Sequence, residues 1–205
     1  MTLARKLMIA FGSLALLVLL TAGLGLRAAG VSNDAFAGYV AGAAHRMALA
    51  NHVIALVDER ALAARNLLLT TDPKEMAAAR DDALKAQAGI DAELQKLVTS
   101  AQTAPDPKVR ELVGSIAAVE AKYAVVAKDI VQRAMAGDRD GALARLRTDC
   151  HPLLDALQQA SDAYLQYSMQ RATEESSRAD AAHASARLWL LALLVPRSLN
   201  QALGA

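Results

Sequence analysis

The sequence predicts an all-α protein whose main part is an up-down-up-down antiparallel four-helix bundle. Only 3% of the 205 residues are aromatic, and alanine and leucine dominate, which is typical of helices rather than sheets. Apolar residues recur at intervals of three and four in four long segments, and short breaks separate these segments. No segment alternates apolar and polar residues as a strand would. Long helices joined by short connections favour antiparallel neighbours in a bundle.

We expect the four helices over residues 31–70, 73–101, 107–136 and 139–186. The fourth segment contains Pro152, which predicts either a kink or a short helix followed by a long one. The first and fourth segments are longer than the middle pair, so both could continue into membrane helices.

Start and stop signals mark the breaks between these segments. Asp72 precedes Pro73 and Asp106 precedes Pro107, the pattern of an N-capping carboxylate followed by proline in the first turn. Glu75 stands at capping-box spacing from Asp72. These signals predict that the second and third helices begin at the two prolines.

Composition excludes several classes of function. The formal net charge of +1 provides no strong field for nucleic acid. The single cysteine, Cys150, excludes an internal disulfide and a metal site built from several cysteines. We expect no cofactor.

An apolar run near the N-terminus predicts a transmembrane helix at residues 7–27. Arg5 and Lys6 precede about twenty uncharged residues, a length that matches a hydrocarbon core of roughly 30 Å. A cleaved signal peptide is the alternative, although its apolar region is shorter, about 7–15 residues. The positive-inside tendency places residues 1–6 in the cytoplasm. We therefore expect the following chain to lie in the periplasm, beyond the bacterial inner membrane.

The remaining chain divides into three parts. Residues 28–186 hold the predicted helices and form the expected periplasmic ligand-binding domain. Residues 187–195 include eight apolar residues, about 12 Å of helix, and look like a truncated second transmembrane helix. Residues 196–205 form a polar tail that begins with a proline.

This layout resembles the periplasmic four-helix-bundle sensor domain of bacterial methyl-accepting chemotaxis receptors. The resemblance covers about residues 1–195 and includes the block Arg60-x-x-x-x-Arg65-Asn66-Leu67-Leu68-Leu69-Thr70-Thr71-Asp72-Pro73 at the end of the first helix. The tail at 196–205 resembles the opening of a HAMP linker. The resemblance implies the sensor region of a chemoreceptor, without enzymatic activity, whose output module is missing from this sequence.

The resemblance also implies a homodimer with its ligand at the interface. The ligand would be a small organic acid or amino acid. Alternatively, the domain would recognise a periplasmic binding protein that carries the small ligand. In the aspartate-sensing members, arginines from the first helices of both subunits hold the ligand carboxylates, and Arg60 and Arg65 match two of them. Leu69 stands where a third arginine would be, and Ala64 replaces a hydroxyl residue. Aspartate itself is therefore not the expected ligand.

Arg60 and Arg65 point in different directions on the predicted helix. Five residues rotate a helix by about 500°, which leaves the two side chains about 140° apart. In a twofold dimer, each helix could offer one arginine to each of two pockets. Arg60 also falls on the apolar stripe, where a guanidinium needs a partner. A ligand carboxylate could be that partner. The alternatives are that Arg60 pairs with Asp58 or Glu59 of the other subunit, or that its side chain extends until the guanidinium reaches water.

Five further residues are weaker candidates for ligand contact. Tyr123 and Tyr164 lie on helical seams, where a tyrosine more often packs in the core. Polar groups near the start of the fourth helix complete the site in aspartate-sensing relatives, and here Thr148, Asp149 and His151 surround the break at Pro152. Arg133 is expected to be solvated.

Three alternatives differ from a chemoreceptor. A haem or metal bundle could use His45 and His52, but Cys150-His151 lacks the second cysteine of a haem-attachment motif. An enzyme would need a nucleophile elbow, a phosphate loop or paired carboxylates, and none is evident. The input domain of a sensor histidine kinase or a cyclase stays open, because only the cytoplasmic part distinguishes it.

Overall fold

The computed structural model describes residues 40–194 continuously, and before them only residues 5, 8, 11, 12, 19, 21–23 and 27. Apart from those isolated positions, the expected transmembrane helix at 7–27 and the tail at 196–205 lie outside the described residues. Within the described part, no helix is both long and apolar enough to cross a membrane. The chain divides into two compact units, one of Val40–Gln170 and one that combines Met1–Tyr39 with Arg171–Ala205.

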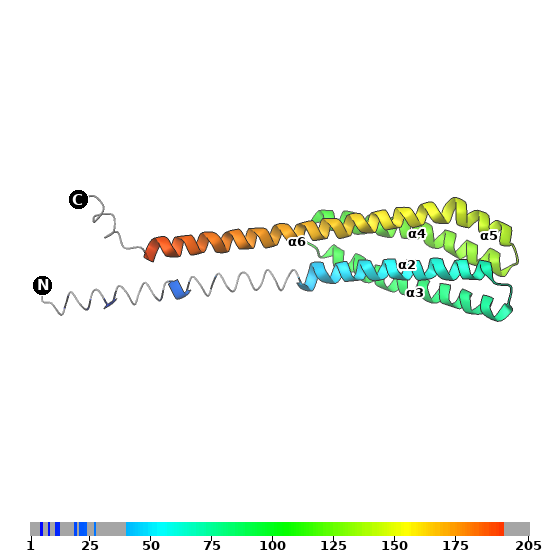
Figure 1. Ribbon diagram of the computed structural model, residues 1–205, viewed down its shortest axis with the longest axis horizontal. Helices are drawn as coiled ribbons and strands as arrows, with labels where there is room; N and C mark the ends of the chain where they lie inside the picture. The colour runs from blue at the N-terminus through cyan, green and yellow to red at the C-terminus, as the bar shows by residue number, and fades with distance from the viewer. Residues whose placement is uncertain are drawn as a thin grey trace. The chain divides into compact units, whose positions relative to one another are not determined.

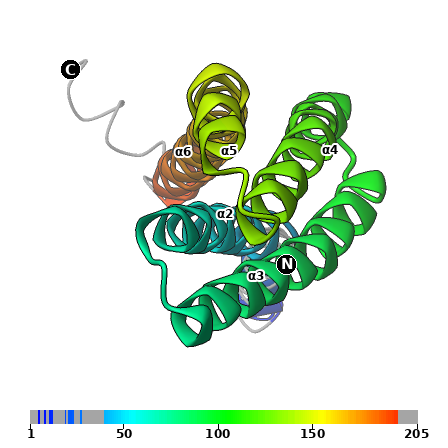
Figure 2. The ribbon, with the colours of Figure 1, turned by 90° about the vertical axis from the view of Figure 1, so that its right-hand side faces the viewer.

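Helices build the unit Val40–Gln170. They are α2 (His45–Leu69), α3 (Pro73–Gln102), α4 (Pro107–Met135), the short α5 (Arg139–Arg145) and the first part of α6 (His151–Leu194). π-helical turns η1 (Val40–Ala44) and η2 (Leu146–Cys150) precede α2 and α6. Figures 1 and 2 show α2, α3, α4 and the α5–α6 segment side by side around a common interior. The described residues contain no strand, so the all-α prediction is confirmed.

The core consists of aliphatic side chains and two tyrosines, with alanines between them. Its largest fully buried apolar residues are Tyr123, Tyr164, Leu67, Ile90, Leu97, Ile116, Ile130 and Leu157. All of them lie on the predicted three-four stripes. Burial of these stripes supplies most of the stability that helices of this kind have.

The start of α3 confirms the predicted cap and changes the predicted role of Glu75. The Asp72 carboxylate accepts hydrogen bonds from the backbone N–H groups of Lys74 (2.7 Å) and Glu75 (3.2 Å). The Glu75 carboxylate does not return to the Asp72 N–H, as a capping box would require. It accepts a hydrogen bond from the Thr70 hydroxyl, and that hydroxyl oxygen accepts from Asp72 N–H at 3.2 Å. Thr70 therefore bridges the two groups.

Aspartates also begin α4 and α5. Asp106 accepts from the N–H of Lys108 at 2.9 Å, and Asp138 accepts from the N–H of Gly141 at 3.0 Å. Gly137, between α4 and α5, has a φ of 84°, a conformation that residues with a side chain rarely adopt. The chain can therefore turn sharply where the third predicted helix ends.

In the fourth predicted helix a short helix, α5, precedes the long α6, as one alternative predicted, but the π-helical turn η2 joins them without a break in the helical backbone. After α5 the backbone makes the π-helical turn η2, in which the N–H of His151 donates to the carbonyl of Leu146. Pro152 is the second residue of α6 and has no N–H to donate to the preceding turn, and the wider π-helical turn η2 lies directly before it. The helix continues to Leu194, beyond the predicted end at 186.

Side chains from distant segments close two ends of the bundle. Arg139 Nη2 donates to the carbonyl oxygens of Leu68, at 2.9 Å, and of Thr70, and so satisfies groups that the end of α2 leaves free. Tyr167 Oη of α6 donates to Asp106 Oδ2 at 2.5 Å, beside the start of α4. Both contacts fix helix ends.

Replacing the Asp72 cap should weaken the bundle. Asp72→Ala removes the acceptor for two backbone N–H groups, so the free energy of unfolding should fall by about 1 kcal/mol. Asp72→Asn keeps a side-chain oxygen that can accept these hydrogen bonds, so it should lower the free energy of unfolding by only a few tenths of a kcal/mol. Urea unfolding of the purified chain measures both. Equal losses for the two variants would show that capping is not what Asp72 contributes.

Candidate functional site

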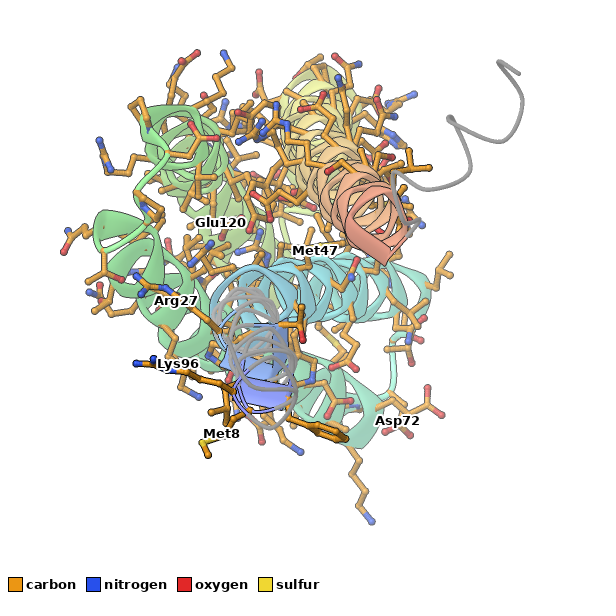
Figure 3. The ribbon with its side chains drawn as sticks, turned by 90° about the vertical axis from the view of Figure 1, so that its left-hand side faces the viewer. Met8, Arg27, Met47, Asp72, Lys96 and Glu120 are labelled. Atoms are coloured by element: carbon orange, nitrogen blue, oxygen red, sulfur yellow. The ribbon has the colours of Figure 1, made fainter. Side chains whose placement is uncertain are left out.

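An ion pair between Arg60 of α2 and Glu120 of α4 lies inside the bundle. Arg60 Nη1 donates to Glu120 Oε1 at 2.6 Å and Nη2 donates to Oε2 at 3.0 Å, so the contact is bidentate. The two side chains are only 2% and 3% exposed. In Figure 3 Glu120 lies among the helices, whereas Lys96 points outward. A planar guanidinium matched to a carboxylate in this way is a strong, directional contact.

Helical spacing places both charges on the inward faces. On α2 the buried row is Val53, Val57, Arg60, Ala64 and Leu67. On α4 it is Val113, Ile116, Glu120, Tyr123 and Ile130. Each row follows intervals of three and four, since buried Ala127 lies between Tyr123 and Ile130, and each of these rows contains one charged residue. The pairing of these two exceptions explains how an arginine can occupy the apolar stripe of α2.

Gln87 and Tyr123 complete the surroundings of the Arg60 guanidinium. Gln87 Oε1 of α3 accepts a hydrogen bond from Arg60 Nη1, and Gln87 Nε2 donates to Asp91 Oδ1 at 2.9 Å. The Arg60 Cζ atom lies 4.3 Å from the centroid of the Tyr123 ring, a cation–π arrangement. Arg60 Nε is buried and has no hydrogen-bond partner among the described residues. Three helices therefore meet at one charged side chain.

The contact extends from Tyr123 to Cys150 in the π-helical turn. Cys150 Sγ donates to Tyr123 Oη at 3.6 Å, and both residues are buried. Burial first, and then the neighbouring thiol, raise the pKa of the Tyr123 hydroxyl far above its ordinary value. Tyr123 consequently remains neutral, and this cluster of Arg60, Gln87, Glu120, Tyr123 and Cys150 links α2, α3, α4 and η2. We call it the Arg60 cluster.

The structure brings Arg60 and Tyr123 together but separates them from the other predicted site residues. Arg65 is exposed, and within the described part of the chain it has no hydrogen bond or ion pair. Tyr164 is fully buried in α6, fourteen residues beyond Cys150, which is about 21 Å along a helix.

Of the three polar residues predicted near Pro152, two already make hydrogen bonds within the chain. Thr148 is exposed and its hydroxyl donates to the Ala144 carbonyl at 2.9 Å, while Asp149 accepts a hydrogen bond from Arg145. His151 is exposed at the start of α6. Cys150, which the sequence analysis did not select, is the residue of this turn that reaches the Arg60 cluster.

Arg133 belongs to a network of ion pairs, rather than being merely solvated as expected. Arg133 Nε and Arg145 Nε both donate to Asp129 Oδ2 at 2.9 Å, and Arg133 Nη1 donates to Asp138 at 2.8 Å. The hydrogen bonds from Arg133 and Arg145 lower the pKa of the Asp129 carboxyl below its ordinary value. This network joins the end of α4 to α5.

The two histidines of the haem alternative lie on the surface of α2. His45 and His52 are exposed, and His52 Nδ1 lies 3.8 Å from Glu93 Oε2 of α3. Across the described residues, no group of three or more His, Cys, Asp and Glu side chains has an arrangement that could hold a metal ion.

Arg60 and Tyr123 are the members of the Arg60 cluster that the sequence predicts as site residues, whereas Glu120 and Gln87 are not among its candidates. Glu120 could have been found, because it is the acid on the apolar stripe of the third helix that the spacing of Ile116 and Tyr123 defines. The expected partners, Asp58 and Glu59, are exposed on α2. Gln87 carries no comparable signal, since half-buried glutamines are common.

Breaking the buried ion pair from one side should be costly. Glu120→Ala leaves a buried guanidinium without its carboxylate, so the free energy of unfolding should fall by about 3–5 kcal/mol. Arg60→Met combined with Glu120→Leu removes both charges and should recover most of that loss. Glu111→Ala, which breaks the exposed Lys108–Glu111 pair, is the matched control and should cost less than about 1 kcal/mol. Urea unfolding compares the variants, and equal effects of Glu120→Ala and Glu111→Ala would contradict the buried pair.

The Asp129 network should contribute a pH-dependent stabilisation. The pKa of the Asp129 carboxyl is lower in the folded chain than the value of about 3.9 that an aspartate has in an unfolded one. The unfolded state therefore binds a proton at Asp129 more readily than the folded state does. The contribution is therefore complete above the unfolded pKa and is lost as the pH falls through the folded pKa. Asp129→Asn should lower stability at neutral pH, and its difference from the unaltered chain should shrink toward pH 2. Unfolding measured from pH 7 to 2 tests this, and a difference independent of pH would contradict it.

Comparison with known proteins assigns the chain to a family. Its sequence matches the family described as a four helix bundle sensory module for signal transduction, over residues 1–183. Neither a search of the curated proteins nor a search of the solved structures found a match. The all-helical fold agrees with the family description, and the match covers most of the chain. The protein therefore belongs to the four-helix-bundle sensory modules of signal transduction.

Proposed function

We propose that this chain is the sensor region of a methyl-accepting chemotaxis receptor that binds a small organic acid or amino acid between two copies. The sensory family supports the receptor role. The observation that carries the site assignment is the contrast between two arginines of α2. Arg60 already holds a carboxylate inside the bundle, whereas Arg65 is exposed and unpaired among the described residues.

The outer face of α2 supports a homodimer. Ala48, Ala55, Leu62 and Leu69 follow one another at intervals of seven, and all four are exposed. Leu62 is 57% exposed and Leu69 is 82% exposed. These residues supply one of the two rows of a helix–helix seam, and the second row, Asn51, Asp58 and Arg65, is polar and would lie beside it. A second copy of α2 would cover this face.

Arg65 lies between Leu62 and Leu69, at the edge of the proposed seam. A small carboxylate bound there would receive charge-assisted hydrogen bonds from a guanidinium that pairs with no acid in the described part of the chain. Thr148, Asp149 and His151 are proposed to add polar contacts near the distal end. Arg60 then acts as a positioning residue, which fixes α2 against α4 and so fixes the direction of Arg65.

Signal transmission is proposed to run along α6. The helix is continuous from His151 to Leu194, and it follows the π-helical turn η2, which holds Thr148 and Asp149 of the proposed polar contacts. In the proposed arrangement the four helices run up, down, up and down, residues 7–27 cross the bacterial inner membrane, and the bundle lies in the periplasm. A ligand that favours one of two packings of α6 would shift this helix by an ångström or two, which is the scale of known helix shifts.

Calorimetry with di- and tricarboxylates and amino acids tests the proposed site. For whichever compound binds, Arg65→Ala should reduce the affinity by about thirtyfold, since a charge-assisted hydrogen bond is worth about 2 kcal/mol. Lys85→Gln, which removes an exposed cation from α3, is the matched control and should leave the affinity unchanged. Unchanged affinity in Arg65→Ala would exclude the assigned contact. A monomeric chain that binds none of these compounds would exclude direct sensing at a dimer interface.

A further inference from the structure

A groove of about 760 Å³ lies between α3 and α4, and its floor is formed by α2. Leu84 and Gln87 belong to the α3 wall, Val125 and Lys128 belong to the α4 wall, and Arg60 lies at the floor. None of the outer-face residues Ala48, Ala55, Leu62, Arg65 and Leu69 lines it. The groove is therefore separate from the pocket proposed on that face.

Small side chains explain why this space exists. Ala64 of α2, Ala83 of α3, and Ala124 and Ala127 of α4 all line the groove. Alanine packs helix backbones closely where two helices meet, but here alanines from three helices face one another and leave the volume between them unfilled. The larger side chains at the mouth do not close it, since Leu84 is 57% exposed and Val125 is 66% exposed.

The size and lining of the groove suit a small molecule with an apolar body. Pockets for small ligands have volumes of about 300–1,000 Å³ and are lined mainly by apolar groups with a few polar ones. Exposed leucine and valine side chains on opposite walls would gain by being covered.

The charges at the groove favour an anion. Lys128 is exposed, and within the described residues its ammonium group has no hydrogen bond or ion pair. Arg80, on the opposite wall, makes its hydrogen bonds and its ion pair, among the described residues, with the neighbouring Asp81, in an exposed pair of the kind that contributes little. The lining also contains one acid, Asp91, on the α3 wall; its carboxylate accepts a hydrogen bond from Gln87 at 2.9 Å and keeps its charge, so a bound anion is assigned to the Lys128 side of the groove.

We propose that this groove binds a small amphipathic carboxylate, with its apolar body against Leu84 and Val125 and its carboxylate at Lys128. Such a ligand would lie beside Arg60 and Gln87 and would hold α3 and α4 at a fixed separation at the level of the Arg60 cluster. The site needs no second copy of the chain, so it is independent of the proposed dimer.

Phenylpropionate and its neutral amide, added to the purified full chain, test the groove by calorimetry. Lys128→Gln should weaken phenylpropionate binding about tenfold and leave the amide unaffected, because only the anion interacts with the ammonium group. Lys122→Gln removes an exposed lysine from another face of α4 and should change neither affinity. Ala124→Phe fills the groove and should abolish binding of both compounds, whereas Ala118→Phe, on the exposed side of α4, should not.

Arg65→Ala separates this site from the one proposed on α2. Phenylpropionate binding that survives Arg65→Ala but not Ala124→Phe supports the groove, whether or not the dimer site exists. The proposal is overturned if the unaltered chain binds neither compound, or if Ala124→Phe binds both as well as Ala118→Phe does. Equal effects of Lys128→Gln and Lys122→Gln would likewise overturn the assigned carboxylate contact.

Discussion

Arg60 and Glu120 bring opposite charges from α2 and α4 into the apolar interior, where neither side chain is more than 3% exposed. A bidentate contact has little tolerance for sliding, because a shift of one helix by a fraction of a turn separates the paired atoms. Gln87 adds α3 to the same point, and Tyr123 with Cys150 adds the π-helical turn. Unpaired, either charge would be costly, so we expect the pair to disfavour other registers of α2 and α4.

This constraint gives the two faces of α2 different roles. The inner face is fixed by the Arg60 cluster, and the outer face carries exposed alanine, leucine and Arg65. A ligand at Arg65 would act on a helix whose position relative to α4 is already set. The proposed displacement is therefore assigned to α6, which begins directly after the π-helical turn that holds Cys150 of the Arg60 cluster. The proposed ligand of the groove between α3 and α4 would contact the same cluster from a second side, beside Arg60 and Gln87.

Local chemistry made much of the fold predictable. Asp72 with Pro73 and Asp106 with Pro107 mark helix starts because capping and proline geometry depend on neighbouring residues alone. Arg60 was recognisable as an inward-facing charge because helical periodicity fixes its direction. Its partner was harder to predict, since Glu120 is sixty residues away and pairing depends on how α2 and α4 are aligned. The π-helical turn and the groove depend on packing between several helices, and the spacing within one helix does not determine them.

Nuclear magnetic resonance of the arginine side chains in the ligand-free chain tests the central claim most directly. If Glu120 holds Arg60 inside the bundle, the Arg60 Nη protons should give separate signals that exchange slowly with water, because the guanidinium is buried and hydrogen-bonded on one edge. The Arg65 Nη protons should exchange rapidly. Arg60 protons that exchange as fast as those of Arg65 would show that Arg60 is not held inside the bundle, and the roles assigned to the two arginines would be wrong.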